Sequence, residues 1–557
     1  MSETEVQPGG MLSDRRARMI TTGVIVAVML ALFATNIMQT IFLCDDAFIS
    51  FRYSRHFADG NGLVWNVGER VEGYSNFLWV IMLGILMKVG IQPEISSLVF
   101  GVLSGLALLA TVVAFSGRRY GWANPWMWFA PLALASNPSF TAWSTGGLET
   151  MFYSFLIFLG LASLLEARGK SSPSRWILAS SVVFALASLT RPDAPLFAGL
   201  GVAFFFGDKI IRERRIPFRE AMTWALPYIA IVGMHYIWRF SYYGVWFPNT
   251  YYAKVNKPWW EQGFRYLDLF ADSYSIYYTI PLLILALVWR PRLESLTFAG
   301  IIIGWGAYVA KIGGDWMENR MLIVLYPMLY WLIGEGLSRL SAMRMASINP
   351  RWPQVVAVVC AVVLLGLTYQ GNRSSVSFSA VASAEEMLSE DAAARRIATV
   401  NALRFYAFIR SEQGKFLRDL VDEGLLPDDL IFGVGGAGAL PYYVMWPSVD
   451  FIGLTDAQVA RQEASSSPAG FVMAGHEKWA SIDYLRERQV VMLDALNQIV
   501  FDAPFDPDND PFKAVRIMVL PDVKLRTVKV KDKYLVFASL VPEEVFQQTF
   551  GHLEIIE

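Results

Sequence analysis

The chain has 557 residues, of which 54% are hydrophobic and only 17% are charged, and its mean hydropathy is positive (+0.38). This composition excludes an ordinary soluble protein and indicates a polytopic membrane protein with one polar portion. The formal net charge of −2 argues against a nucleic-acid partner. The two cysteines, Cys44 and Cys360, lie in contexts too different to pair, so the sequence predicts neither a disulfide framework nor a zinc site.

Apolar stretches follow one another from residue 19 to residue 370. The first follows a basic segment, Asp14 to Arg18, that resembles the start of a signal peptide. Its roughly 25 apolar residues exceed a cleavable hydrophobic region, so we interpret it as a retained helix. Eleven spans are predicted, at about 19–43, 95–116, 121–137, 148–166, 176–190, 194–207, 221–240, 273–289, 296–311, 320–340 and 353–370.

A twelfth apolar stretch, from Asn76 to Val89, decides the topology. If it crossed the membrane, Arg118 and Arg119 would lie opposite the N-terminal arginines, and every later basic loop would be inverted too. If it lies along the outer surface or re-enters, all basic loops fall on the N-terminal side, as the positive-inside rule requires. We therefore expect eleven spans, with outer segments at 44–94, 138–147, 191–193, 241–272, 312–319 and after about 371.

Two carboxylates, Asp45 and Asp46, directly follow the first predicted span. Charge at the membrane surface is costly without a task, so the pair predicts a catalytic or ion-binding site. A helix N-cap with a first-turn carboxylate is the structural alternative. The next residues, Phe48 to Phe57, have the pattern of an amphipathic helix that lies in the membrane interface.

Further polar side chains fall in the outer segments. The first loop is rich in turns, aromatic rings and amides of the kind that hold sugars, with Glu72 and Tyr74 as candidates, although a plain ordered loop would look similar. Glu149 begins a span, where the helix dipole also favours a carboxylate. Arg191 and Asp193 lie between two apolar runs, so they either face a cavity or pair with each other.

Two outer segments supply cations. Lys254 ends the run Asn249–Lys254, after a row of aromatic residues that is also typical of an interfacial belt. A cation beside tyrosines such as Tyr251 can hold a phosphate without a metal. In the loop 313–320, two glycines allow close backbone approach to a ligand, and Arg320 could grip phosphate oxygens through two donors. A snorkelling loop is the alternative.

The residues after 371 are expected to form a soluble α/β domain. Helical patterning from Asp391 to Glu423 precedes a strand at Leu430–Val434, and Gly433–Gly438 matches the dinucleotide fingerprint formally. We interpret those glycines as a tight strand-to-helix turn, because only about ten residues separate them from the next predicted strand. A second polar cluster contains Asp456 and His476, of which His476 is a sugar ligand or a solvated loop residue.

Eight short motifs occur in order along the chain. They are Asp-Asp-Ala-Phe-Ile-Ser-Phe-Arg-Tyr (45–53), Val-Glu-Gly-Tyr-Ser-Asn-Phe-Leu-Trp (71–79), Gly-Leu-Glu-Thr (147–150), Arg-Pro-Asp (191–193), Pro-Asn-Thr-Tyr-Tyr-Ala-Lys (248–254), Gly-Gly-Asp-Trp-Met-Glu-Asn-Arg (313–320), Gly-Leu-Thr-Asp (453–456) and Gly-His-Glu-Lys (475–478). Together they resemble the GT-C membrane glycosyltransferases. Among these, they are most similar to the actinobacterial terminal β-1,2-arabinofuranosyltransferases, which use decaprenylphosphoryl arabinose.

The resemblance runs from about residue 40 to about residue 480. It implies a GT-C fold, a polyprenyl-phosphate sugar donor, transfer on the periplasmic face of a bacterial inner membrane, and a first-loop aspartate as catalytic carboxylate. It also implies a cell-envelope glycan acceptor such as arabinogalactan or lipoarabinomannan. In related enzymes such as oligosaccharyltransferase, a surface helix precedes the second span, which agrees with our placement of Asn76–Val89. Asn319 departs from the family, in which a proline or glycine is expected after Glu318.

These observations assign roles to residues. A polyprenyl phosphate leaves without protonation, so catalysis needs a base for the acceptor hydroxyl and cations for the phosphate. We expect Asp45 as base and Asp46 as its orienting or metal-binding partner. The donor phosphate is assigned to Lys254, Arg191 and Arg320 with Asn249 and Tyr251, and the sugar or acceptor to Glu149, Glu72, Tyr74, Asp315, Trp316, Glu318, Asp456 and His476.

Some alternatives stay open. A divalent cation (Ca, Mg or Mn) could bridge Asp45, Asp46, Glu149 or Asp315 to the phosphate. If a β-linked donor gives a β-linked product, configuration is retained and in-line attack with one base is insufficient. A mannosyl or aminoarabinosyl transferase of the same fold, a polyprenyl-sugar transporter and a sugar-binding scaffold are the rival functions. We expect a monomer in the lipid bilayer, with residues 1–370 as the catalytic domain and 371–557 as a periplasmic domain.

Overall fold

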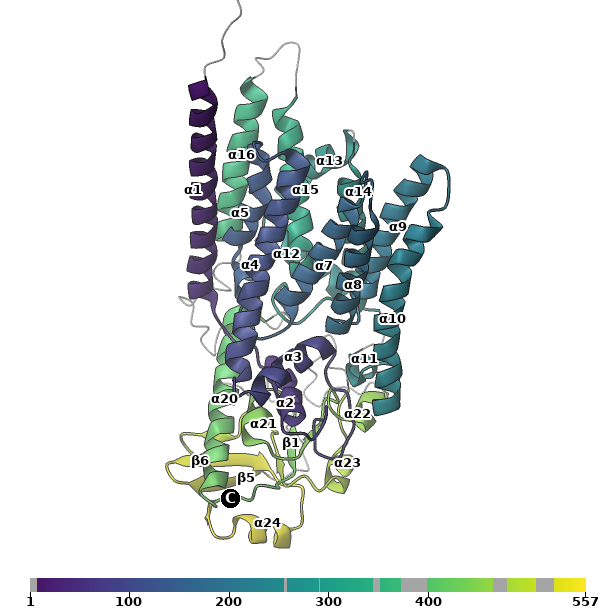
Figure 1. The fold of residues 1–557 in the computed structure, drawn as a ribbon. Helices are drawn as coiled ribbons and strands as arrows, with labels where there is room; N and C mark the ends of the chain where they lie inside the picture. The colour runs from purple at the N-terminus through teal and green to yellow at the C-terminus, as the bar shows by residue number, and fades with distance from the viewer. Residues whose placement is uncertain are drawn as a thin grey trace, which may run out of the picture.

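The computed structural model describes residues 8–254, 258–289, 291–343, 351–371, 398–463, 478–506 and 525–556, with side chains from residue 19 onward. The described chain has two parts, a bundle of long helices and a smaller α/β domain at one end of it (Figure 1).

The bundle consists of helices that run roughly side by side (Figure 1). They are α1 (Pro8–Thr40), α4 (Pro93–Tyr120), α5 (Phe129–Ser136), α7 (Thr150–Glu166), α8 (Ser174–Thr190), α9 (Ala194–Glu213), α10 (Phe218–Tyr243), α13 (Ile280–Val288), α14 (Leu293–Ile312), α15 (Tyr326–Ser341) and α16 (Arg351–Gln370). Each of the eleven predicted spans overlaps one of them. The shorter helices α6 (Pro138–Trp143) and α12 (Trp260–Ser273) connect neighbours in this part.

Length and composition identify membrane-spanning helices among the described residues. Six helices are long and apolar enough to cross a bilayer, or seven if α12 and the segment Ile276–Val288, which are bent by 73°, form one span. The apolar helices α7 and α8 have 17 residues each, somewhat short to cross alone, and pack closely against each other inside the bundle. The chain is therefore a multi-pass membrane protein.

Local sequence signals set the ends of these helices, as α4 shows. Pro93 occupies the first turn together with Glu94, where a fixed φ and a negative charge both favour a helix start. Arg118 and Arg119 occupy the last turn, where they complement the helix dipole. The helix then stops at Gly121, whose φ of 90° is accessible mainly to glycine.

The helix α3 (Phe77–Lys88) lies across the end of the bundle, beside α2 (Ala47–Ala58), as Figure 1 shows. Its 12 residues extend for about 18 Å, which is too short for the roughly 30 Å of a hydrocarbon core. The stretch from Asn76 to Val89 therefore does not add a span, in agreement with the prediction from loop charges.

The environment of α2 differs from the prediction of a helix in the membrane interface. Most of its residues are buried, because α2 packs between α3 and the α/β domain. Arg52 is only 1% exposed and donates hydrogen bonds to the carbonyls of Trp65 (3.0 Å), Pro441 (2.6 Å) and Trp446 (2.8 Å). The alternation of aromatic and basic residues reflects burial against a second domain and not contact with lipid headgroups.

The α/β domain begins with the long helix α20 (Val400–Asp422) and contains one mixed sheet. The spatial order of its strands is β2 (Ser448–Asp450), β1 (Phe432–Val434), β3 (Met492–Leu493), β6 (Lys533–Ala538), β5 (Leu525–Val530) and β7 (Glu554–Ile555). A further strand, β4 (Val500–Phe501), also pairs with β6. β1 is parallel to β2 and β3, and the other pairs are antiparallel. Four short helices complete the domain: α21 (Ala439–Val444), α22 (Ala457–Arg461), α23 (Ile482–Glu487) and α24 (Glu543–Phe550).

The glycine-rich segment after β1 leads directly into α21, as expected for a strand-to-helix turn. The strand predicted at Leu430–Val434 is shorter than expected, since β1 starts at Phe432, and the next strand, expected at Val449–Leu454, ends at Asp450. The carboxylate of Asp450 explains that end, because it accepts backbone hydrogen bonds from Ile452 (2.9 Å) and Thr455 (2.9 Å) and so turns the chain.

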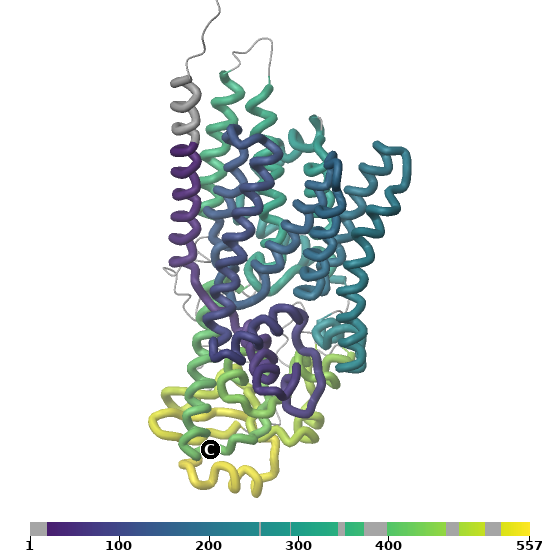
Figure 2. The backbone as a smooth tube through the Cα atoms, in the orientation of Figure 1, coloured from purple at the N-terminus to yellow at the C-terminus, as the bar shows by residue number. Residues whose placement is uncertain are grey.

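The two parts share an extensive junction. Figure 2 shows the segment that follows α1 packed against the segment around α21, although some 390 residues separate them. An apolar cluster fills the junction and includes Ile49, Tyr53, Trp65, Val80, Tyr243, Ala437 and Leu454. Residue Ala398, just before α20, also pairs with Met317 in the loop between α14 and α15. The predicted active-site segments therefore lie between the bundle and the domain.

Candidate active site

A group of charged side chains gathers where the bundle meets the α/β domain. Asp46 precedes α2, and its electrostatic neighbours are Lys254, Arg320, Asp315 and Glu149. Lys254 ends the short helix α11 (Asn249–Lys254), Glu149 precedes α7, and the other two belong to the loop between α14 and α15. Outer segments that are far apart in the sequence therefore converge, as the sequence analysis expected.

Ion pairs fix one edge of this group. Glu149 accepts from Arg191 (Nη1 to Oε1, 3.0 Å) and from Asn76 (Nδ2 to Oε2, 2.8 Å). Arg191 also pairs with Asp193 (2.7 Å), which places its guanidinium between two carboxylates. The ion pair between Arg191 and Asp193, which was the structural alternative for Arg191, is thus present. It orients the guanidinium, and Arg191 still belongs to the charged group.

Arg320 forms the opposite edge. Its Nε donates to Asp315 (Oδ2, 2.8 Å), and this is its one ion pair within the described residues. The remaining guanidinium donors are available to an anion in a fixed geometry.

Asp46 and Lys254 are the half-buried members of the group whose side chains have no hydrogen bond or ion pair in the described part of the chain. Burial raises the pKa of Asp46, while Lys254 and Arg320 act in the opposite direction. Burial lowers the pKa of Lys254, while Asp46 opposes that change. A carboxylate and an ammonium without committed partners can accept a proton and bind an anion, respectively.

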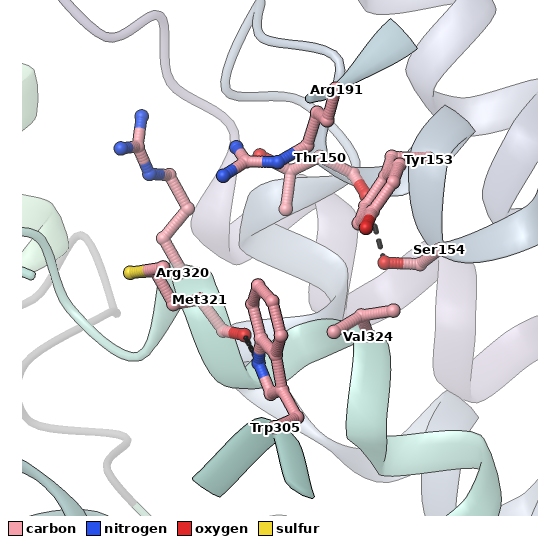
Figure 3. Close-up of a pocket in the computed structure, with 8 residues that line it drawn as sticks. All are labelled: Thr150, Tyr153, Ser154, Arg191, Trp305, Arg320, Met321 and Val324. Atoms are coloured by element: carbon pink, nitrogen blue, oxygen red, sulfur yellow. Dashed lines mark hydrogen bonds between the residues drawn. The ribbon is translucent and has the colours of Figure 1, made fainter. Parts of the chain in front are cut away.

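A small pocket opens beside the two arginines (Figure 3). Its lining residues are Thr150, Tyr153, Ser154, Arg191, Trp305, Arg320, Met321 and Val324. The guanidinium groups of Arg191 and Arg320 lie on one side of it, and Trp305 and Val324 lie on the other (Figure 3). The pocket therefore has a cationic side and an aromatic and apolar side.

Asp45 points away from this group and into the α/β domain. It is 4% exposed, and its Oδ1 accepts a hydrogen bond from the backbone N–H of Ala439 at 2.8 Å. A Cβ at Gly438 would lie 2.0 Å from its Oδ2, so only glycine allows this approach. Burial raises the pKa of Asp45 to about 7, against the hydrogen bond from Ala439 and the charge of Arg410.

Several other predicted site residues lie in the junction between the bundle and the α/β domain and do not belong to the charged group. Glu72 forms a buried ion pair with Arg239 (2.9 Å), and burial raises its pKa to about 7. The hydroxyl of Tyr74 lies 3.1 Å from that of Tyr243. The amide of Asn249 donates to carbonyls of the α/β domain at Gly453, Leu454 and Asp456.

The remaining predicted residues have separate places. Tyr251 is exposed and stacks on Phe247, and the carbonyl of Trp316 accepts from Ala398 (2.6 Å). Glu318 is buried and accepts hydrogen bonds from Ser139, Trp143 and Asn319. Asp456 caps α22 and accepts from Tyr484 (2.7 Å). His476 lies outside the described residues.

The described residues do not form the predicted metal site. Among them, no three His, Cys, Asp or Glu side chains come together in a way that could hold an ion. Asp45 accepts from Ala439 of the α/β domain, and both oxygens of Glu149 already accept from Asn76 and Arg191.

Solved structures of two proteins share this arrangement of bundle and domain. ArnT from Cupriavidus metallidurans bound to undecaprenyl phosphate has a TM-score of 0.55 at 15% identity, over 94% of this chain and 98% of that chain. The apo oligosaccharyltransferase of Archaeoglobus fulgidus has a TM-score of 0.52 at 9% identity, over 94% of this chain and 77% of that chain. Such neighbours are GT-C membrane glycosyltransferases.

The chain has the GT-C fold. No protein-family model matches it.

Curated relatives of this GT-C chain carry the name terminal β-(1→2)-arabinofuranosyltransferase. The protein from Mycobacterium tuberculosis is 25% identical over 339 residues, which are 54% of this chain and 53% of that protein. The protein from Corynebacterium glutamicum is 25% identical over 323 residues, which are 51% of this chain and 46% of that protein. The chain thus spans about half the length of the curated relatives that it matches.

Sequence reasoning gave no role to three residues of the candidate site. Asn76 holds Glu149 in place, and in the sequence it stood out only as the start of the apolar stretch Asn76–Val89 and as part of the motif at 71–79. Tyr153 lines the pocket, and its position four residues after Glu149, one helical turn away, was an available signal. Trp305 lies mid-helix in α14, and nothing in its local sequence distinguishes it from a core residue.

Proposed function

We propose that this GT-C chain is a glycosyltransferase that moves D-arabinofuranose from a polyprenyl-phosphate donor to a cell-envelope glycan. The observation that carries the proposal is the placement of Lys254 and Arg320 beside the unpaired carboxylate of Asp46, with Arg191 next to Arg320. The names of the curated relatives support the sugar. The GT-C neighbour bound to undecaprenyl phosphate supports a lipid-linked donor.

The same geometry indicates how the residues divide the reaction. The donor phosphate lies against Arg320 and Lys254, whose charges stabilise the phosphate as the bond from its oxygen to the sugar C1 breaks. The leaving phosphate keeps the bonding electron pair and needs no proton. The acceptor hydroxyl forms the new C1–O bond and gives its proton to Asp46. We assign the base to Asp46 in place of Asp45 because Asp45 is turned toward Ala439.

We further propose that the reaction takes place on the periplasmic side of a bacterial inner membrane. Basic residues such as Arg118, Arg119 and Arg175 lie at the bundle end opposite the α/β domain, which supports this orientation. In this proposal, residues 1–370 form the catalytic domain and residues 371–557 the periplasmic one.

Reconstitution of the full chain in liposomes tests the function. We expect transfer from decaprenylphosphoryl arabinose to an arabinan oligosaccharide, detected by mass spectrometry as a gain of one pentose. Parallel assays with polyprenylphosphoryl mannose and aminoarabinose examine the two rival sugars. Assays with and without a chelator of divalent cations examine metal dependence. Absence of transfer from all three donors, by protein that still binds polyprenyl phosphate, would contradict the proposal.

A further inference from the structure

Two sequence motifs of the α/β domain play no part in the proposed reaction. They are Gly-Leu-Thr-Asp (453–456) and Gly-His-Glu-Lys (475–478), and the structure describes the whole of the first and Lys478 of the second. The first motif and Lys478 both contact the short helix α11, which packs against α22 (Figure 1). That helix ends at Lys254, the cation assigned to the donor phosphate. Parts of both motifs therefore meet at one element of the candidate site.

The helix α11 is too short to be stable by itself. It has six residues, fewer than the roughly 12–15 at which an isolated helix becomes even marginally stable in water. The last four carbonyls of a helix have no partner inside it, and in α11 the carbonyl of Tyr252 is one of them. Contacts with neighbouring segments must therefore hold this helix in place and supply donors to its carbonyls.

The ammonium group of Lys478 is such a donor. Its Nζ donates to the carbonyl of Tyr252 at 2.8 Å and to the carbonyl of Ala460, near the end of α22, at 2.7 Å. The residue is buried, with 6% of its surface exposed. A cation near the last carbonyls of a helix satisfies them and complements the helix dipole. Lys478 does this for two helices at once and so joins the end of α11 to α22.

Asn249 attaches the start of α11 to the same domain. Its side-chain amide donates to the carbonyls of Gly453 (2.9 Å), Leu454 (3.0 Å) and Asp456 (3.1 Å). Its backbone N–H donates to the carbonyl of Glu72 in the first outer loop at 2.8 Å. The side chain is buried, with 3% of the residue exposed. Both ends of α11 are therefore tied to the α/β domain by buried hydrogen bonds.

We propose that Lys478 and Asn249 are positioning residues that hold Lys254 in the charged group. Both act through α11, because their side-chain nitrogen atoms donate to backbone carbonyls. With α11 held in this way, Lys254 has Asp46 and Arg320 as electrostatic neighbours. The inference rests on the proposed function for the phosphate as the ligand of Lys254. The α/β domain then contributes to donor binding through the placement of a cation that the bundle carries.

Binding of farnesyl phosphate to the full chain in nanodiscs tests this role without requiring transfer. We expect Lys478→Met and Asn249→Ala each to weaken binding about three- to ten-fold, as for the loss of one hydrogen bond, because Lys254 is no longer held beside the phosphate. In a chain that already carries Lys254→Ala, the same substitutions should have no further effect, since they act only through that side chain. Lys415→Met removes an exposed cation of α20 in the same domain and should bind the probe as the wild type does.

Titration separates the affinity from the number of binding sites. Partial unfolding of a variant would reduce the number of sites, whereas a misplaced Lys254 reduces the affinity of each site. The inference is overturned by wild-type affinity in both single variants, by a fall in the number of sites alone, or by additive losses of affinity in the double variants. If the losses are non-additive but the wild type transfers no sugar in the liposome assay, the proposed sugar transfer fails and the positioning role stands.

Discussion

Asp45 and Asp46 are adjacent in the chain, shortly after the first helix, but their surroundings differ. Asp45 caps the start of α21 through the Ala439 N–H, whereas Asp46 lies among Lys254, Arg320 and Asp315. Successive residues that enter a helix point in different directions, so one of two adjacent carboxylates can bind the domain while the other faces the cations. Substitutions at Asp45 and at Asp46 should therefore have different effects on activity.

Conservative substitution separates the two roles. We expect Asp46→Asn to reduce transfer by on the order of 10²-fold or more, because it removes the base. Asp45→Asn should retain most activity, since the amide oxygen can still accept from Ala439, whereas Asp45→Ala should lose it. Rates in reconstituted liposomes provide the measurement, with folding checked by thermal unfolding. Inactive, folded Asp45→Asn together with active Asp46→Asn would restore Asp45 as the base.

The proposed binding site for the donor phosphate can be tested by replacing its cations. Replacing Lys254 or Arg320 with Ala removes a charge-assisted hydrogen bond worth roughly 1.5–3 kcal/mol, so the KM for the donor should rise about ten-fold or more. The KM for the acceptor should change less. Lys311→Ala, an exposed cation at the end of α14, is the control. An unchanged donor dependence in both variants would argue against the phosphate site.

The buried carboxyl of Asp45 also predicts how stability varies with pH. Its pKa of about 7 in the folded chain lies above the ordinary value of 3.8. Between these values the folded state keeps a proton that the unfolded state has lost, so stability falls as pH rises from about 4 to about 7, by at most ~4 kcal/mol. Unfolding temperatures at pH 5 and pH 8 should therefore differ, and Asp45→Asn should reduce the difference. An identical pH dependence in wild type and variant would contradict this account.

At the scale of elements, α2 and α3 show what the sequence can predict. Loop charges correctly placed α3 outside the set of spans, because the positive-inside rule counts residues over the whole chain. The same sequence misled us about α2, whose aromatic and basic alternation suits lipid headgroups and a protein interface equally well. Its partner α21 lies almost 390 residues further along the chain, and local patterns carry no information about such a contact.

Arg52 in α2 should be required for docking of the α/β domain. Arg52→Met removes three hydrogen bonds to carbonyls, two of them in that domain, and leaves those carbonyls buried. We expect a loss on the order of 3 kcal/mol or more, visible as faster proteolysis of the domain. Arg55→Met, whose side chain lies over the ring of Tyr442, should have a smaller effect. Equal protease resistance of wild type and Arg52→Met would contradict this role.

At the scale of the whole molecule, the two ends of the helical bundle differ in charge and in shape. The α/β domain and the charged group occupy one end of the bundle, and basic residues such as Arg118 and Arg175 occupy the other. The sequence predicted this division because loop charge is a sum over many residues. It could not predict which outer side chains meet, since Asp46, Arg191 and Arg320 come together only when the helices pack.

Cysteine labelling in oriented vesicles tests this division. In a chain with Cys44 and Cys360 replaced, exposed positions Gln92 and Gln548 should react with an impermeant reagent from the periplasmic side, and Ser172 only from the cytoplasmic side. Gln92 follows α3 and Gln548 lies in α24, so their shared side requires that α3 does not cross. Labelling of Gln92 together with Ser172 would instead make α3 a span. It would put the two ends of the first outer loop on opposite sides of the membrane, and the packing of α3 against α2 beneath the charged group would be impossible.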